Sequence, residues 1–139
     1  MLSLPLLPRW LRHTALLALL VLASGCALRT ASPPTPPWPG VLQTLLPTDV
    51  LLLGEKHDAP QHQQLERQAV TWLAERGLLA ALVLEMAERG HDTRALEPSA
   101  SEAQVQAALD WNTDAWPWPA YGPVAMAAVR AGVPVLRGN

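Results

Sequence analysis

The sequence predicts an α/β fold: a three-layer parallel sheet with flanking helices, incomplete at its C-terminal end. Two observations lead to this class. Short apolar runs that suit strands buried on both faces alternate with segments that have helical periodicity and helix-capping residues. These segments follow one another in the order β-α-β-α-α-β, and right-handed crossovers between such strands give a parallel sheet with helices packed against it.

Three segments are predicted as strands. Residues 49–54 and 80–86 are continuous apolar runs, which is the pattern of strands covered on both faces. Residues 133–136 form a shorter third strand. A sheet of this kind would normally continue beyond its third strand, so we expect residues 41–139 to be the N-terminal part of a longer domain.

Three helices are predicted between these strands. The first is expected to begin at Asp58, a possible N-cap, with Pro60 in its first turn, and to end before Gly77. The second begins at overlapping capping boxes within residues 99–104 and runs for about two turns. The third is expected over residues 123–131, where a proline opens the segment and a glycine follows it.

The first 25 residues predict a lipoprotein signal peptide. Arg9 and Arg12 precede an apolar stretch that is too short to span a bilayer comfortably, and small residues lead to Cys26, the only cysteine. Acylation of Cys26 would anchor the protein to a membrane, whereas an ordinary secretory signal or a plain membrane anchor are the alternatives. Residues 26–40 are rich in proline and predict an extended tether. Because Ala27 follows the cysteine, we expect a lipid-anchored protein of the cell envelope, at the outer membrane.

Composition narrows the possible partners. The chain has 139 residues and a net charge of −2, from 10 Lys and Arg residues against 12 Asp and Glu residues. This balance lacks the basic surface that nucleic acid binding requires, so we expect no nucleic acid partner. The residues after the tether suffice for about one small domain.

Acidic and histidine side chains follow the first two predicted strands. Glu55 and His57 come directly after the first strand, Glu85 ends the second, and His62 lies in the first turn of the intervening helix. Because ligands of open α/β sheets bind beyond the carboxyl ends of the strands, we expect these groups to lie close together. They could bind a metal or act as acid and base; taken singly, each could equally be a solvated loop residue.

A second unusual segment is rich in aromatic residues. Residues 110–123 contain Trp111, Trp116 and Tyr121 among several prolines, which we expect to exclude a regular helix. These rings could form the wall of a site for a flat apolar ligand such as a porphyrin, with Tyr121 or His57 as an axial ligand of haem iron. Alternatively, the tryptophans cover the sheet edge and brace the loop.

These residues, in this order and spacing, resemble the haem-binding uptake lipoproteins of the ChaN type. The resemblance implies haem binding in iron acquisition at the outer membrane, with iron-uptake machinery as partner and a homodimer joined through haem. It also implies tyrosine ligation, for which Tyr121 is the candidate that this chain offers. The residues that carry the resemblance are Leu53-Gly54-Glu55-Lys56-His57-Asp58 with His62-Gln63-Gln64, Leu84-Glu85-Met86, Trp111, Trp116, Tyr121 and Pro123, and Pro134-Val135 before Gly138-Asn139.

Two alternatives stay open at this point. The element from Gly54 to His57 is similar to that of erythromycin-esterase-like hydrolases and Tiki-type metalloproteases. In such an enzyme His57 would activate water, Glu55 and Glu85 would orient or balance it, and a divalent metal could take part. The other alternative is a non-catalytic surface interaction module. We find no complete set of nucleophile, base and orienting group, and therefore expect binding rather than catalysis.

Overall fold

The computed structural model describes residues 38–87 and 89–138. Cys26, the predicted signal peptide and most of the predicted tether lie outside these residues. In the described part, no helix is long and apolar enough to cross a membrane. The elements, in chain order, are α2 (Trp38–Thr44), α3 (Pro60–Ala74), β1 (Leu82–Leu84), α4 (Glu102–Ala108), α5 (Trp118–Arg130) and β2 (Val135–Arg137).

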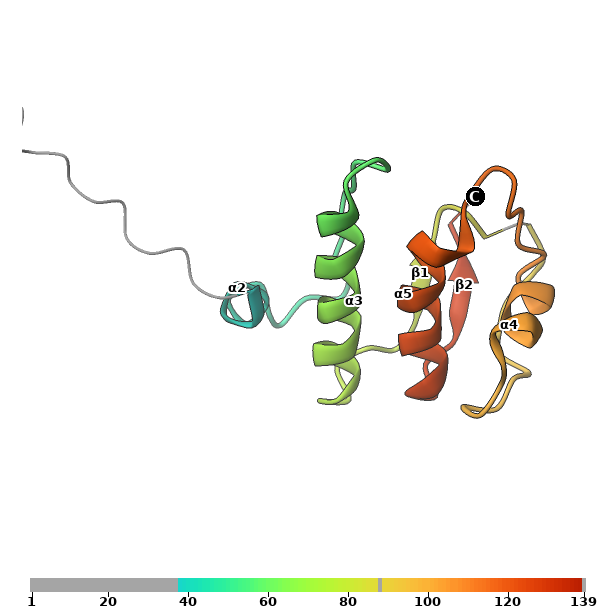
Figure 1. Ribbon diagram of the computed structural model, residues 1–139. Helices are drawn as coiled ribbons and strands as arrows, with labels where there is room; N and C mark the ends of the chain where they lie inside the picture. Colours follow the sequence, from blue (N-terminus) through green and yellow to red (C-terminus); the bar gives the residue numbers. More distant parts are fainter. Residues whose placement is uncertain (1–37, 88, 139) are drawn as a thin grey trace, which may run out of the picture. The chain divides into compact units, whose positions relative to one another are not determined.

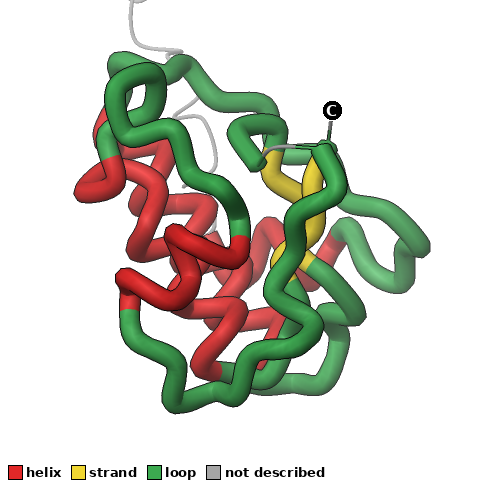
Figure 2. Tube along the Cα trace, turned by 90° about the vertical axis from the view of Figure 1, so that its right-hand side faces the viewer, coloured by secondary structure: helices red, strands yellow, loops and turns green. Residues whose placement is uncertain are grey.

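The two strands form a small parallel sheet, and helices pack beside it. Leu82 of β1 pairs with Val135 of β2, and Leu84 pairs with Arg137. Helices α3 and α5 lie side by side, with the sheet behind α5 and with α4 on the far side of α5 from α3 (Figure 1). The short strands are surrounded by long loops (Figure 2). This arrangement confirms the parallel α/β class in its coarse form.

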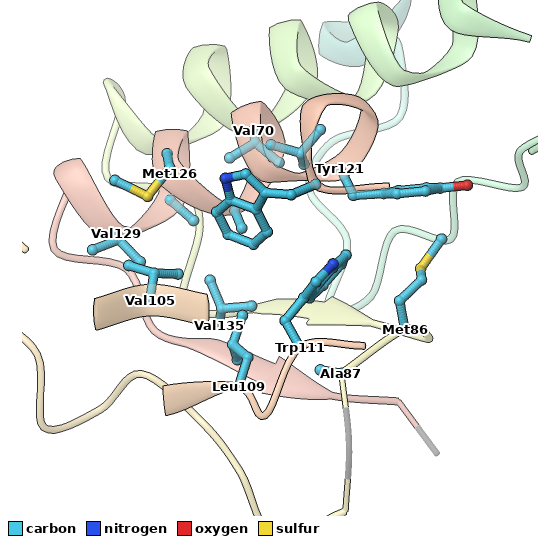
Figure 3. Close-up of a cluster of buried hydrophobic side chains, with 14 of the residues drawn as sticks. Val70, Met86, Ala87, Val105, Leu109, Trp111, Tyr121, Met126, Val129 and Val135 are labelled. Carbon is cyan, nitrogen blue, oxygen red and sulfur yellow. The ribbon is translucent and has the colours of Figure 1, made fainter. Parts of the chain in front are cut away.

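The hydrophobic core lies between the sheet and helices α3, α4 and α5 (Figure 3). Val70 of α3, Val105 of α4 and Val135 of β2 all belong to it. Leu82 and Leu84 pack against this cluster from β1 because alternate residues of a strand point to the same face. Each core-facing element therefore contributes apolar side chains to one shared cluster.

The predicted ends of the first helix are partly confirmed. Pro60 is its first residue, and Gly77 follows it with a φ of +65°, a left-handed conformation that glycine adopts at helix ends. The predicted N-cap is wrong: Ala59 occupies that position and makes no side-chain capping bond. Asp58 instead lies 3.5 Å from the ammonium group of Lys56, where both side chains are exposed.

Of the other two helices, α4 begins as predicted and α5 does not. Helix α4 has the expected capping box between Ser101 and Gln104. Helix α5 begins at Trp118, five residues before the predicted start, so the expectation that prolines exclude a helix from this region is wrong. Pro119 is tolerated because backbone N–H groups of a first turn have no helical partner, and Pro123 lies inside the helix at the loss of one backbone bond.

The prediction of a strand at residues 49–54 is wrong. This segment pairs with neither β1 nor β2, and its side chains Val50 and Leu52 are 69% and 88% exposed. Val83, in the middle of β1, is 56% exposed on the face opposite the core. An apolar run becomes a buried strand only where another layer covers it, and the described residues leave Leu52 and Val83 largely in solvent. A second helical layer therefore stays a prediction.

Candidate functional site

Two loops meet at the edge of the sheet where the strands end. Residues 55–59 lead into α3, and residues 109–117 lead from α4 to α5. Both loops lie at the upper end in Figure 1, together with the carboxyl ends of β1 and β2. This is the edge at which ligands of open α/β sheets bind.

A carboxylate and an imidazole lie at the centre of this edge. The Nδ1 atom of His57 donates to Oε1 of Glu55 at 2.5 Å. Gln63 donates from Nε2 to Oε2 of the same carboxylate at 3.0 Å and to the carbonyl oxygen of His57 at 3.3 Å. The side chain of Glu55 is 7% exposed, whereas that of His57 is 48% exposed. The buried carboxylate thus holds one imidazole nitrogen and leaves the other, Nε2, for a ligand.

A tight turn produces this arrangement. The N–H of Ala59 donates to the carbonyl oxygen of Lys56 at 2.8 Å, so the chain reverses before α3 begins. The reversal brings His57 back toward Gln63 in the first turns of the helix. His62 stabilises the same loop, because its Nδ1 accepts the backbone N–H of Lys56 at 3.0 Å. His62 therefore ties the loop to the helix.

The charges around His57 favour its protonated form. Its hydrogen bond to Glu55 raises the pKa of His57, and desolvation opposes this effect. The negative charges of Glu55, Glu85 and Glu66 raise the pKa further. Glu85 is exposed at the end of β1 and acts on His57 through its charge. The structure thus brings Glu55, His57 and Glu85 to one edge of the sheet.

Aromatic rings form the other side of this edge. Trp116, which is half-buried, meets His57 edge to face with 4.9 Å between ring centroids, and Tyr121 lies 5.7 Å from Trp116. Trp111 is buried, and its Nε1 donates to the carbonyl oxygen of Trp116 at 2.8 Å. Trp111 therefore braces the loop, as one of the two interpretations of the sequence proposed. Trp116 is the ring that a ligand beside His57 can reach.

Tyr121 is almost completely buried, unlike His57. It is 4% exposed, and Figure 3 shows its hydroxyl group pointing away from the core cluster. Burial raises the pKa of Tyr121 to about 12, and its interaction with the carboxylate of Glu55 adds to this shift. Iron binds tyrosine as the phenolate and histidine as the neutral imidazole, so either residue must lose a proton before it ligates iron, and burial makes this loss harder for Tyr121.

Sequence reasoning assigned no role to two α3 residues of the site. Gln63 is buried and holds Glu55; its place seven residues before buried Val70, on the core-facing stripe of the helix, could have revealed it. Glu66 is half-buried, and burial raises its pKa to about 7, with the charge of Glu55 adding to the shift and that of His57 opposing it. No sequence signal marks Glu66, because glutamates on helices are usually solvated.

Few side chains at this edge are available as direct ligands of a metal ion. Within residues 38–87 and 89–138, no group of three or more His, Cys, Asp or Glu side chains could hold a metal ion. The Nδ1 atoms of His57 and His62 are both engaged by the protein. A bare divalent cation needs several protein ligands, whereas haem iron receives four nitrogens from the porphyrin and needs only one or two more.

Comparison with known proteins gives a family. Residues 41–139 match the model of the family described as haem-binding uptake, Tiki superfamily, ChaN. The curated proteins and the solved structures gave no match. The matched range includes both loops of the candidate site and both strands that position them. The chain therefore belongs to the ChaN-type haem-binding uptake family of the Tiki superfamily.

Proposed function

We propose that this protein binds haem, or a related iron or porphyrin ligand, at the carboxyl edge of its sheet. The observation that carries the proposal is the half-exposed His57, which is held at Nδ1 by the buried carboxylate of Glu55. A carboxylate at the second nitrogen of a histidine fixes the ring and strengthens the other nitrogen as a metal ligand. The family match supports haem as the ligand.

The residues at the edge fit the parts of a haem molecule. Bound haem would supply an iron with an open axial position in a flat apolar ring that carries two carboxylates. His57 offers the axial nitrogen, and Trp116 offers an apolar surface beside it. Gln63 holds Glu55, so the imidazole keeps its orientation before a ligand arrives. His57 is better placed than Tyr121 because its side chain is half-exposed.

A haem titration of the purified full chain tests this proposal. The wild-type protein should give a Soret band that saturates, and His57→Ala should weaken the affinity at least about tenfold, as for the loss of one axial ligand. Tyr121→Phe should change the affinity little. His91→Ala serves as control, since His91 is exposed and lies 4.0 Å from Asp110. Retained affinity in His57→Ala together with lost affinity in Tyr121→Phe would instead assign the iron ligand to the tyrosine.

The setting that we propose is iron acquisition in the cell envelope. Cys26, outside the described residues, would carry a lipid that anchors the protein, most simply at the outer membrane. Transfer of haem to iron-uptake machinery and a dimer joined through haem belong to the same proposal. Cys26→Ser should release the protein from the membrane fraction, and globomycin should block processing of the wild type. Unchanged membrane association in Cys26→Ser would contradict the anchor.

The hydrogen bond between Glu55 and His57 also favours a second function. A histidine oriented by a buried carboxylate is the arrangement of a general base, which would activate water in a hydrolase of the Tiki superfamily. Assays of ester and peptide hydrolysis test this alternative. Turnover that His57→Ala abolishes and that haem does not affect would favour the hydrolase over the haem-binding protein.

A further inference from the structure

A buried arginine nitrogen lies at the carboxyl edge of the sheet. The Nη1 atom of Arg137 is buried and has no hydrogen-bond partner in the described part of the chain. Buried polar atoms of native proteins nearly always have a partner, and leaving such an atom without one is unfavourable. An atom of this kind is therefore a candidate contact for a ligand.

Backbone pairing fixes the position of Arg137 at the end of the sheet. Arg137 ends β2 opposite Leu84 of β1, and the next residue, Gly138, donates its N–H to the carbonyl oxygen of Leu84 at 2.8 Å. Residues two apart on a strand share a face, so Arg137 lies on the same face as the fully buried Val135. Figure 3 shows Val135 and Trp111 together on this face. The side chain of Arg137 therefore leaves the sheet on the face that the core residues cover.

The surrounding charges indicate which kind of ligand needs this arginine. Glu55, Glu66 and Glu85 all act on His57 at this edge. A ligand that carries carboxylates is repelled by these groups unless a cation compensates. Lys56 is engaged with Asp58 in solvent, at 3.5 Å. Arginine suits the task because its planar fork can donate two parallel hydrogen bonds to one carboxylate.

We infer that Arg137 binds a carboxylate of the tetrapyrrole ligand and forms the anion-binding part of the site. The identity of the ligand rests on the proposed function, whereas the unpaired nitrogen is independent of it. Arg137 neither ligates iron nor takes part in a reaction. It selects tetrapyrroles that have free carboxylates over those in which the carboxylates are blocked.

The first test needs no ligand. In the ligand-free full chain, Arg137→Met removes a buried nitrogen atom that has no hydrogen-bond partner and keeps an unbranched apolar side chain. The urea midpoint of unfolding should therefore equal or exceed that of the wild type. Arg130→Met is the matched control, because Arg130 lies in the last turn of α5, away from the edge where the strands end. A clearly lower midpoint for Arg137→Met alone would mean that the protein already pairs Arg137, and would overturn the inference.

The second test compares haem with its dimethyl ester, in which both carboxylates are blocked. Arg137→Met should weaken haem binding about tenfold to a hundredfold, the factor of a charge-assisted hydrogen bond. The affinity of Arg137→Met for the ester should stay within about twofold of the wild-type value, because the ester has no free carboxylate for Arg137 to bind. Arg137→Lys should recover part of the haem affinity because it keeps the charge.

The outcomes separate this inference from the proposed function. Equal losses for haem and ester would assign Arg137 to packing, and unchanged haem affinity would exclude a contact. Either result overturns the inference and leaves haem binding intact. If the wild type binds neither ligand, the proposed function fails and the inference fails with it.

Discussion

The two faces of the small sheet carry similar side chains in opposite surroundings. On one face, Val135 is fully buried beneath helix α5, and Leu82 and Leu84 pack against the same cluster. On the other face, Val83 is more than half exposed. Leu52, outside the sheet in the segment before α3, is almost completely exposed. An apolar side chain therefore stabilises this domain only where other residues cover it. Stability should come from the covered face, and the exposed apolar residues should contribute little.

The largest difference in stability is expected between two leucine truncations, one on each side of this contrast. Leu109 is fully buried, so Leu109→Ala should lower the free energy of unfolding by about 2–5 kcal/mol through lost burial and a residual cavity. Leu52→Ala should change it by less than about 0.5 kcal/mol. Urea denaturation followed by circular dichroism measures both values. Equal losses would show that the segment around Leu52 is packed against something.

Two glycines provide a test in which the chemical change is identical. A Cβ at Gly122 would lie less than 3.0 Å from ring atoms of Trp118, whereas a Cβ at Gly54 would meet nothing within 4 Å. Gly122→Ala should therefore destabilise the protein by about 1–3 kcal/mol, although alanine has the higher helix propensity. Gly54→Ala should be close to neutral. Stabilisation by Gly122→Ala would mean that Trp118 moves aside without loss of packing.

Two carboxylates three positions apart extend the comparison to the binding edge. Glu55→Ala removes one of the two acceptors of the buried Gln63 amide and the partner of Nδ1 of His57, so it should destabilise the protein by about 1–3 kcal/mol. Asp58→Ala removes only an exposed ion pair with Lys56 and should change the stability by less than about 1 kcal/mol. Thermal unfolding of the two variants under the same conditions measures the difference in stability. Equal effects would contradict a structural role for the buried carboxylate.

The last comparison concerns the pH dependence that Glu66 contributes. Its pKa rises from 4.5 in the unfolded chain to about 7 in the folded protein, so the folded state binds more protons between these values. The free energy of unfolding should therefore fall as the pH rises from 4.5 to 7. Glu66→Gln should flatten this dependence, whereas Glu75→Gln, at an exposed position after α3, should not. Unfolding midpoints at several pH values across this range measure the slope. An unchanged slope in Glu66→Gln would contradict the shift.

Features set by neighbouring residues could be predicted from the sequence. Pro60, Gly77 and the pair Ser101 and Gln104 mark helix ends because their effects are local. The strand at residues 49–54 was predicted wrongly because an apolar run does not tell whether a second layer covers it. The early start of α5 was missed because prolines are compatible with a first helical turn.

The same distinction holds for the site. The contact between Glu55 and His57 is local, because the two residues are two positions apart, and it forms although the strand predicted before them is absent. Gln63 and Arg137 depend on how α3 and β2 are placed around that loop. Their roles follow from burial and from hydrogen bonds across the fold, which periodicity in a single segment does not specify.

Electron paramagnetic resonance of the ferric haem complex tests the central claim most directly, because the spectrum distinguishes imidazole from phenolate ligation. We expect an imidazole-ligated iron in the wild type and in Tyr121→Phe, and loss of that signal in His57→Ala. A phenolate signal that disappears in Tyr121→Phe, or an imidazole signal that survives in His57→Ala, would contradict this claim.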